Sequence, residues 1–283
     1  MDRPPRPSLR LFRLIPCVLL LAACHPVMHR DNGEGFRRGN AYYTGDGVTQ
    51  DFAEAARWYR QAALEGNAGA CFNLALQYQE GQGVPQDLAE AARWYQRAAE
   101  RGLARAQFNL GLMYRSGQGV RQSHDEALKL FRWAAAQDNP AACNLLGSMA
   151  LLGEGMDPDA AVAESWFRRA VEMGLNDACF NLALLIESGQ APTKDMTKAA
   201  RWYHRAAEAG QTASQVNLGA LYHEGRGVEQ DPVQAWIWWE RAARQGHAGA
   251  ARNRDIVAKH MSAAQLGEAR RQVDAGVAEP VTP

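Results

Sequence analysis

The chain has 283 residues, of which 47% are hydrophobic, and its 31 Lys and Arg residues balance 31 Asp and Glu residues. This length and apolar content can bury the core of one large domain or of two ordinary ones. The balanced charge argues against a nucleic-acid-binding protein, the five cysteines are too few for a disulfide scaffold, and no apolar run reaches the roughly 20 residues of a membrane-spanning helix.

The N-terminus has the features of an export signal. Arginines precede an apolar stretch over residues 14–23, which is too short to span a membrane and ends in small residues. Its end, Leu21-Ala22-Ala23-Cys24, resembles the lipobox of bacterial lipoproteins. The resemblance implies removal of residues 1–23 and lipid attachment at Cys24. The alternative is an ordinary cleaved signal that contains a cysteine.

The lipobox resemblance also implies a location. Acyl chains on Cys24 anchor a protein to a membrane, stably when there are two or more. Because His25 rather than Asp follows the cysteine, we expect the bacterial outer membrane, with the protein facing the periplasm. Residues 24–32 are then a short tether.

A period of 36 residues organises the chain over residues 33–258. One glycine series comprises Gly45, Gly81, Gly117, Gly153, Gly189 and Gly225. A second series comprises Gly66, Gly102, Asp138, Gly174, Gly210 and Gly246. Self-similarity at a fixed spacing of this size is the signature of a repeat array. The register continues without an insertion through about six copies.

Each copy is predicted to contain two helices. The first helix follows the N-cap residues Asp51, Asp87, Ser123, Asp159, Asp195 and Asp231. Capping boxes are predicted where Glu or Gln stands three residues later, at Glu54, Glu90, Glu126 and Gln234. An alanine and aromatic stripe runs through this helix, and Gly66 or its equivalent ends it. The second helix is expected over about residues 68–80 and its equivalents.

The two ends of the array differ from its middle. Residues 36–43 match the phase of residues 72–79, so the array opens with a second helix that lacks its partner. Near the other end, Arg254 replaces the buried leucine seen at Leu110 and Leu218. Ser262 and Gln265 then predict a capping box, and with it a terminal capping helix over residues 259–276 before a tail at 277–283.

One helical hairpin cannot bury its own apolar face, but a stack of hairpins can. The predicted fold is therefore all-α: an α-solenoid of helix-turn-helix repeats with a period of 36 residues, wound as a right-handed superhelix.

The pattern A-x-F-N-L-x-x-x-Y-x-x-G-x-G-V, continued by D-x-x-x-A-x-x-W-Y-x-x-A-A-x-x-G, reads off residues 70–102. It resembles the Sel-one-like repeat, a relative of the tetratricopeptide repeat. The resemblance covers residues 34–258 and implies a scaffold or adaptor that binds proteins through an extended concave surface. Copy three departs from the pattern, because Leu130 replaces Trp and Asp138-Asn139-Pro140 replaces the glycine turn.

No catalytic site is expected, although some relatives of this family have been linked to penicillin binding or hydrolysis. No serine is followed by lysine at the third position, and neither Ser-Asp-Asn nor Lys-Thr-Gly occurs. The Gly-x-Gly pairs, such as Gly81 and Gly83, lack the strand of a phosphate loop, and their regular recurrence favours structural turns.

Cofactors and metals are not expected either. Cys71, Cys143 and Cys179 share one phase and are predicted to be small buried hydrophobic residues. No histidine spacing is typical of a zinc site, so His204 and His223 are interpreted as solvated helix positions.

The expected ligand is another protein, of a kind that the sequence does not identify; the oligomeric state is likewise left open. In tetratricopeptide-like stacks the first helices line the concave face, and here their non-core positions are basic. These positions are Arg57, Arg93, Lys129 and Arg201 in one phase, and Arg97, Trp133, Arg169 and Arg205 in another. Such a stripe could recruit an acidic segment. The alternative is a solvated face, in which Glu54–Arg57 and its equivalents cancel.

Two aromatic irregularities favour a protein-binding role for this surface. Trp133 occupies a phase that is Arg or Gln elsewhere, and Trp236-Ile237 replaces Ala-Arg. Tryptophan and arginine are enriched at interface hot spots. The alternative for Trp236 is that it packs under the terminal helix.

Three functions are consistent with these features. The first is a non-catalytic periplasmic lipoprotein that binds another protein, and the family resemblance makes an immunity protein against a secreted effector one candidate within it. The second is an envelope hydrolase acting on peptidoglycan or β-lactams. The third is a structural scaffold for envelope assembly or export.

Overall fold

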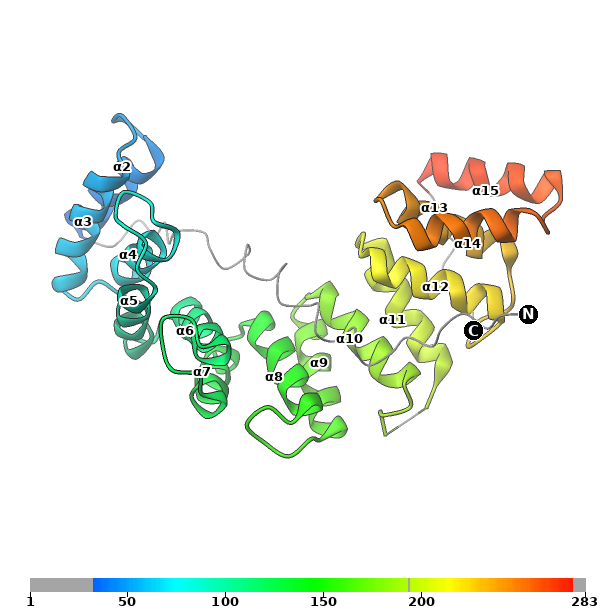
Figure 1. Ribbon diagram of the computed structural model, residues 1–283, viewed down its shortest axis with the longest axis horizontal. Helices are drawn as coiled ribbons and strands as arrows, with labels where there is room; N and C mark the ends of the chain where they lie inside the picture. Colours follow the sequence, from blue (N-terminus) through cyan, green and yellow to red (C-terminus); the bar gives the residue numbers. More distant parts are fainter. Residues whose placement is uncertain (1–32, 193, 277–283) are drawn as a thin grey trace. The chain divides into compact units, whose positions relative to one another are not determined.

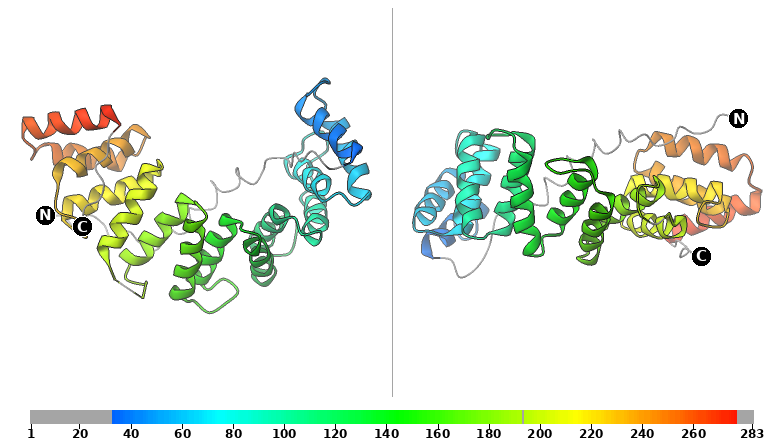
Figure 2. Two further views of the ribbon diagram at one scale, coloured as in Figure 1. Left: turned by 180° about the vertical axis from the view of Figure 1, so that it is seen from behind. Right: turned by 90° about the horizontal axis from the view of Figure 1, so that it is seen from below.

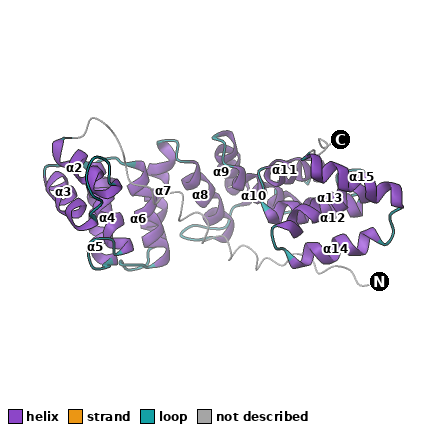
Figure 3. Ribbon diagram, turned by 90° about the horizontal axis from the view of Figure 1, so that it is seen from above, coloured by secondary structure: helices purple, strands orange, loops and turns teal. Residues whose placement is uncertain are grey.

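The computed structural model describes residues 33–192 and 194–276. This part of the chain forms fourteen helices and no strands. Figure 1 shows the helices as ribbons, and Figure 3 colours them apart from the loops. The predicted all-α repeat fold is confirmed. Among the described residues, no helix combines the length and the apolar character needed to cross a bilayer. The predicted signal peptide, Cys24, the tether and the tail lie outside the described residues.

The chain divides into two compact units, residues 1–142 and 143–283. The helices of the first unit are α2 (Glu34–Thr44), α3 (Phe52–Leu64), α4 (Ala68–Glu80), α5 (Leu88–Glu100), α6 (Ala104–Ser116) and α7 (His124–Ala136). Helix α8 (Pro140–Leu152) contains the boundary. The helices of the second unit are α9 (Ala160–Glu172), α10 (Asn176–Glu187), α11 (Met196–Glu208), α12 (Thr212–Glu224), α13 (Pro232–Arg244), α14 (Ala248–Ala258) and α15 (Ala263–Ala275). Figure 2 shows the helices of each unit following one another as hairpins.

The predicted N-caps are present, but their geometry differs in one respect from the prediction. The Asp51 carboxylate accepts hydrogen bonds from the Ala53 and Glu54 amides at 2.9 and 3.0 Å. The capping boxes predicted for the repeats were wrong, because Glu54, Glu90 and Glu126 pair with the basic residue three positions later and Gln234 bonds Gln272. The box predicted at Ser262 and Gln265 is confirmed.

Aromatic pairs join several second helices to the first helix that follows them. Four pairs have ring centroids 5.4–6.0 Å apart: Phe36–Tyr59, Phe72–Tyr95, Phe108–Phe131 and Phe180–Tyr203. The two rings of a pair belong to two successive copies of the repeat. In these copies one hairpin thus supplies a ring that its neighbour buries, which helps explain why a stack is stable where one hairpin is not.

A small residue on the second helix makes room for the aromatic ring of the first helix that follows. A β carbon added at Gly147 would come within 2.6 Å of the Phe167 ring, and one at Gly219 within 2.7 Å of the Trp239 ring. Ala75 and Ala183 occupy the same phase in other copies and are fully buried. The small side chains therefore set how closely the helices approach.

The loop glycines are structural, as predicted. Gly83, Gly119 and Gly227 have φ of about +70°, and a β carbon at each would lie 2.2–2.3 Å from the backbone of the first residue of an earlier helix. At these three positions the second glycine of a Gly-x-Gly pair therefore lets the loop contact the start of the first helix of the same hairpin. Asp138 replaces glycine at one helix end and adopts a φ of 57°.

Candidate protein-binding surface

The first helix of each copy has one buried face and one exposed face. In unit 1 the predicted residues Arg57, Arg93 and Lys129 lie on the exposed face, with side chains that are 76%, 73% and 53% accessible. Arg201 is exposed on α11 in unit 2. The predicted basic positions are thus on the surface, whereas their assignment to a concave face stays a prediction.

These basic side chains already have acidic neighbours. The Arg57 guanidinium lies 2.5 Å from the Glu54 carboxylate, and the Lys129 amine lies 3.7 Å from Glu126. Exposed pairs of this kind contribute about 0–1 kcal/mol. They keep the face soluble and add little to the stability of the fold.

A second basic row covers tryptophan rings, an arrangement that was not predicted. The guanidinium carbons lie 4.5 Å from the ring centroid for Arg97 over Trp94 and 5.8 Å for Arg169 over Trp166. Arg241 stacks in the same way on Trp238 at 4.8 Å. The signal was present in the sequence, because each arginine follows its tryptophan by three residues, about one helical turn. Arg205 instead reaches the Val171 carbonyl at 3.4 Å.

In copy three, whose first helix is α7, the tryptophan stands in the position that arginine has in copies two and four. Leu130 occupies the tryptophan phase and is 4% exposed, whereas Trp133 occupies the arginine phase and is 45% exposed. The Lys129 amine lies 5.0 Å from the Trp133 ring centroid. An indole that other copies cover is therefore presented at the surface of α7. We name Arg57, Arg93, Arg97, Lys129 and Trp133 the unit 1 basic-aromatic face.

The structure buries Trp236 and Ile237, two of the candidate partner-binding residues. Trp236 is 6% exposed and Ile237 is fully buried. Both belong to an apolar cluster that includes Ala269 and Val273 of α15. The alternative stated for Trp236, packing under the terminal helix, is what the structure has. Neither side chain is accessible to a partner while α15 covers it.

His204 is a second correction. It was interpreted as solvated, but it is only 9% exposed and packs edge-on against Trp238, with ring centroids 5.4 Å apart. His223 is exposed, as expected, beside Trp239. Among the described residues, no group of three or more His, Cys, Asp or Glu side chains is arranged to hold a metal ion.

The three cysteines of the described residues are buried free thiols, as predicted. Cys71, Cys143 and Cys179 each have no exposed surface. Burial raises the pKa of the Cys71 and Cys179 thiols, and nearby arginines offset this only in part. A raised thiol pKa lowers the thiolate fraction at neutral pH, so these groups are poor nucleophiles.

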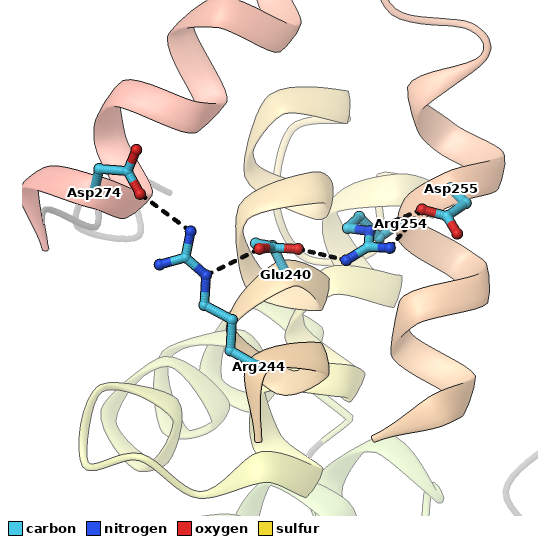
Figure 4. Close-up of polar contacts among 5 residues, drawn as sticks. All are labelled: Glu240, Arg244, Arg254, Asp255 and Asp274. Carbon is cyan, nitrogen blue, oxygen red and sulfur yellow. Dashed lines mark hydrogen bonds and ion pairs between the residues drawn. The ribbon is translucent and has the colours of Figure 1, made fainter. Parts of the chain in front are cut away.

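A polar cluster joins the last three helices, where the sequence indicated only a decaying repeat. Figure 4 shows Glu240 of α13 between two arginines. Its carboxylate lies 2.7 Å from Arg254 of α14 and 2.9 Å from Arg244, which also lies 3.1 Å from Asp274 of α15. Arg254 replaces the buried leucine of other copies and pairs with Glu240. The residue equivalent to Glu240 in those copies is Arg, Gln or His.

The comparisons with known proteins agree with the repeat architecture. The model of the Sel1 repeat family matches residues 36–67, 68–103, 104–139, 140–175, 176–211 and 212–247. No curated protein matches the chain. A solved structure similar to it is a Sel1 repeat protein from Oxalobacter formigenes, with 32% identity, a TM-score of 0.68, and coverage of 77% of this chain and 63% of that one. This chain therefore spans less than two thirds of that protein.

Two further solved structures are similar over most of this chain. One is c5321, described as a protective antigen of uropathogenic Escherichia coli with an SLR fold, at 29% identity, a TM-score of 0.42 and coverage of 87% of this chain and 68% of that chain. The other is the immunity protein Pa5087 from Pseudomonas aeruginosa, at 18% identity, a TM-score of 0.46 and coverage of 77% of this chain and 83% of that chain.

Proposed function

The chain belongs to the Sel1 repeat family, and from this premise we propose that it is a non-catalytic scaffold that binds another protein. The observation that carries the proposal is Trp133, a tryptophan with 45% of its surface exposed, within an array in which arginines cover Trp94 and Trp166. An exposed indole beside basic side chains has the composition of an interface hot spot.

The charges of the unit 1 basic-aromatic face favour an acidic partner segment. Arg57 and Arg93 can transfer from their weak internal pairs to a partner carboxylate, which a guanidinium can bind with two hydrogen bonds. Trp133 then supplies apolar contact area at small cost in conformational entropy. The partner is therefore an acidic segment with at least one apolar side chain directed at α7.

Site-specific photo-crosslinking in the native cells tests this proposal. A photoreactive phenylalanine analogue replaces Trp133 or Arg93 in the full chain, and replaces exposed Arg121 in a loop of the same unit as the matched control. We expect the same protein to be captured at Trp133 and Arg93 and not at Arg121. Equal capture at all three positions, or none, contradicts the proposal.

The captured partner then allows a quantitative test. Trp133→Gln introduces the residue type of Gln61, which occupies the same phase in copy one. We expect at least a tenfold weaker Kd, about 1.4 kcal/mol, because loss of a hot-spot tryptophan costs that much or more. Arg121→Gln is the control and should leave Kd unchanged.

We also propose that the mature protein is lipid-anchored at Cys24 and faces the periplasm. The support is the sequence of the leader, with its arginines, its apolar stretch and the Leu21-Ala22-Ala23-Cys24 end. Cys24→Ser in the full chain should abolish lipid labelling and release the protein from the membrane fraction. A Cys24→Ser protein that stays membrane-bound and is processed normally contradicts the anchor.

An immunity role is the narrower proposal, and it depends on the family resemblance and the expected periplasmic location. It predicts that deleting the gene makes the cell sensitive to an effector secreted by its own kind, and that the wild-type gene restores resistance. The Trp133→Gln gene should restore resistance poorly, whereas the Arg121→Gln gene should restore it fully. Full viability of the deletion strain beside effector-secreting sister cells contradicts this role.

A further inference from the structure

Helix α15 does not continue the stack. In the repeats, α3, α5, α7, α11 and α13 each pack against the second helix that precedes them, through pairs such as Phe72–Tyr95. Helix α15 instead packs on α13, the first helix of the last copy. Arg244–Asp274 at 3.1 Å and Gln234–Gln272 at 3.4 Å join the same two helices, and Figure 4 shows the first of these contacts.

The covered face of α13 is the one that other first helices expose. Ile237 occupies the phase of Arg57, Arg93, Lys129 and Arg201, all of which are exposed. Gln234 occupies the phase of Glu54, which is 35% accessible, but Gln234 itself is only 3% exposed. In the last copy, therefore, a helix of this chain occupies the face that carries the basic residues elsewhere.

The contact surface between α15 and α13 is small. Helix α15 buries only Ala269 and Val273, whereas α13 buries seven residues. The Arg244–Asp274 pair is exposed, with side chains 55% and 69% accessible, so it holds the helix weakly. Gly267 in the middle of α15 also disfavours the helical state. Local opening of α15 therefore costs less than unfolding of α13.

Opening of α15 uncovers apolar surface that the fold otherwise hides. Trp236 and Ile237 lie in the cluster that Ala269 and Val273 complete. A tryptophan next to a β-branched side chain on a rigid helix forms an anchor site for a second helix. The occupant already present shows which chemistry fits this site.

We propose that α15 is a displaceable helix, and that the α13 face beneath it is a second binding surface, which takes an amphipathic helix from a partner protein. The partner helix repeats the pattern of α15: apolar side chains at the spacing of Leu266, Ala269 and Val273, and a carboxylate that meets Arg244. This surface differs from the unit 1 basic-aromatic face, so either proposal can fail while the other stands.

The first test uses substitutions in the full chain that stabilise or destabilise α15 in its position on α13. A β carbon at Gly267 meets only the end of the Arg271 side chain, at 3.7 Å, so Gly267→Ala is sterically free. We expect it to slow hydrogen exchange in α15 about fivefold, the factor that corresponds to the helix preference of alanine over glycine. Asp274→Arg should speed exchange in α15 about two- to fivefold, because it replaces a weak attraction to Arg244 with a repulsion. The hydrogen-exchange rates of α13 are the internal reference with which those of α15 are compared.

The second test measures access to the α13 face. The probe is a fluorescent peptide of residues 262–276, added to full-chain wild type, Gly267→Ala and Asp274→Arg proteins. Compared with the wild type, we expect weaker binding to Gly267→Ala and tighter binding to Asp274→Arg, by about the factors seen in exchange. An Ile237→Asp protein, checked for native circular dichroism, should not bind the peptide.

Three outcomes overturn the proposal. The first is that α15 amides of the wild type are as protected as those of α13. The second is that the peptide binds the wild type and Gly267→Ala proteins equally. The third is a wild-type dimer in light scattering that Ile237→Asp abolishes, because the occupant is then a second copy of this chain.

Discussion

At Gly147 a single methyl group decides how two helices pack. A β carbon there would lie 2.6 Å from the Phe167 ring and 3.1 Å from the Ala163 carbonyl oxygen, so movement of the ring alone does not relieve the contact. We expect Gly147→Ala to lower the free energy of unfolding by about 1–3 kcal/mol, the usual cost of overpacking a core. Thermal and urea denaturation measure the change.

The same substitution at an open site provides the control for this prediction. Gly267→Ala meets no close neighbour, so it should be neutral or stabilising because alanine is the better helix former. If Gly147→Ala is also neutral, the packing in the second unit is looser than the ring contacts indicate.

Buried thiols provide a second prediction about single residues. Because burial raises the pKa of Cys71 and Cys179, the thiolate fraction of both groups is small at about pH 8, and the packing around them adds a steric barrier to the reagent. We expect iodoacetamide to leave both groups unmodified in the native protein and to modify both in denaturant, with peptide mass spectrometry as the readout.

An exposed thiol in the same protein serves as the control for this labelling. Ser116 lies on the surface at the end of α6, so the thiol introduced by Ser116→Cys should react within the labelling time. Comparable labelling of Cys71 and of this introduced thiol in the native state contradicts the prediction.

At the scale of elements, the last three helices depend on the ionisation of one carboxylate. Burial works to raise the pKa of Glu240, but hydrogen bonds from Arg254 and Arg244 outweigh it, and the pKa lies below that of a free glutamate. A group with a lowered native pKa adds stability above its unfolded pKa, about 4.5 here, and that contribution is lost as the pH falls through the native value.

We therefore expect Glu240→Gln to cost about 1–3 kcal/mol at pH 7, the usual worth of hydrogen bonds to a charged group. The difference in melting temperature between wild type and Glu240→Gln should shrink as the pH is lowered from about 5 to 3, because protonation of Glu240 removes the same interactions. Glu229→Gln, on an exposed loop residue of the same unit, is the matched control. A difference in melting temperature between the wild type and Glu240→Gln that stays constant over this pH range contradicts the stabilising role of the Glu240 carboxylate.

Helix α13 also shows which features of the fold can be predicted from the sequence. The start and end of α13 follow from local chemistry, an aspartate whose side chain accepts amide hydrogen bonds and a glycine with positive φ, so both were predictable. The docking of α15 on α13 depends on contacts between residues far apart in the sequence, such as Arg244 and Asp274, which no repeat phase encodes. The sequence therefore left two readings of Trp236 open, a partner-binding residue or one packed under the terminal helix, and placed Ile237 among the candidate partner-binding residues.

At the scale of the whole molecule, the repeat period made the fold predictable, because every copy solves the same packing problem with the same residue types. The candidate binding face was less predictable. Arg97 and Arg169 share a phase with Trp133, yet they cover tryptophans, and only the structure separates the covering arginines from the exposed indole. Periodicity identifies the positions that are equivalent, and departures from it become informative once the neighbours are known.

A chain in which helices contact mainly their neighbours in sequence should also lose stability locally. Helix α6 packs on α5 and α7, and α12 packs on α11 and α13. A β carbon at Gly111 of α6 would lie 2.7 Å from the Phe131 ring, and one at Gly219 of α12 would lie 2.7 Å from the Trp239 ring. Stability in such arrays is close to a sum of repeat and nearest-neighbour contributions.

We therefore expect Gly111→Ala to speed hydrogen exchange in α5, α6 and α7 while α11, α12 and α13 keep their wild-type rates. Gly219→Ala should produce the reverse pattern, and each substitution serves as the control for the other. The two proteins should lose similar amounts of stability, because the steric contacts are equally close. If either substitution accelerates exchange in both units to the same extent, the chain unfolds as one cooperative body, and the nearest-neighbour account of this array is wrong.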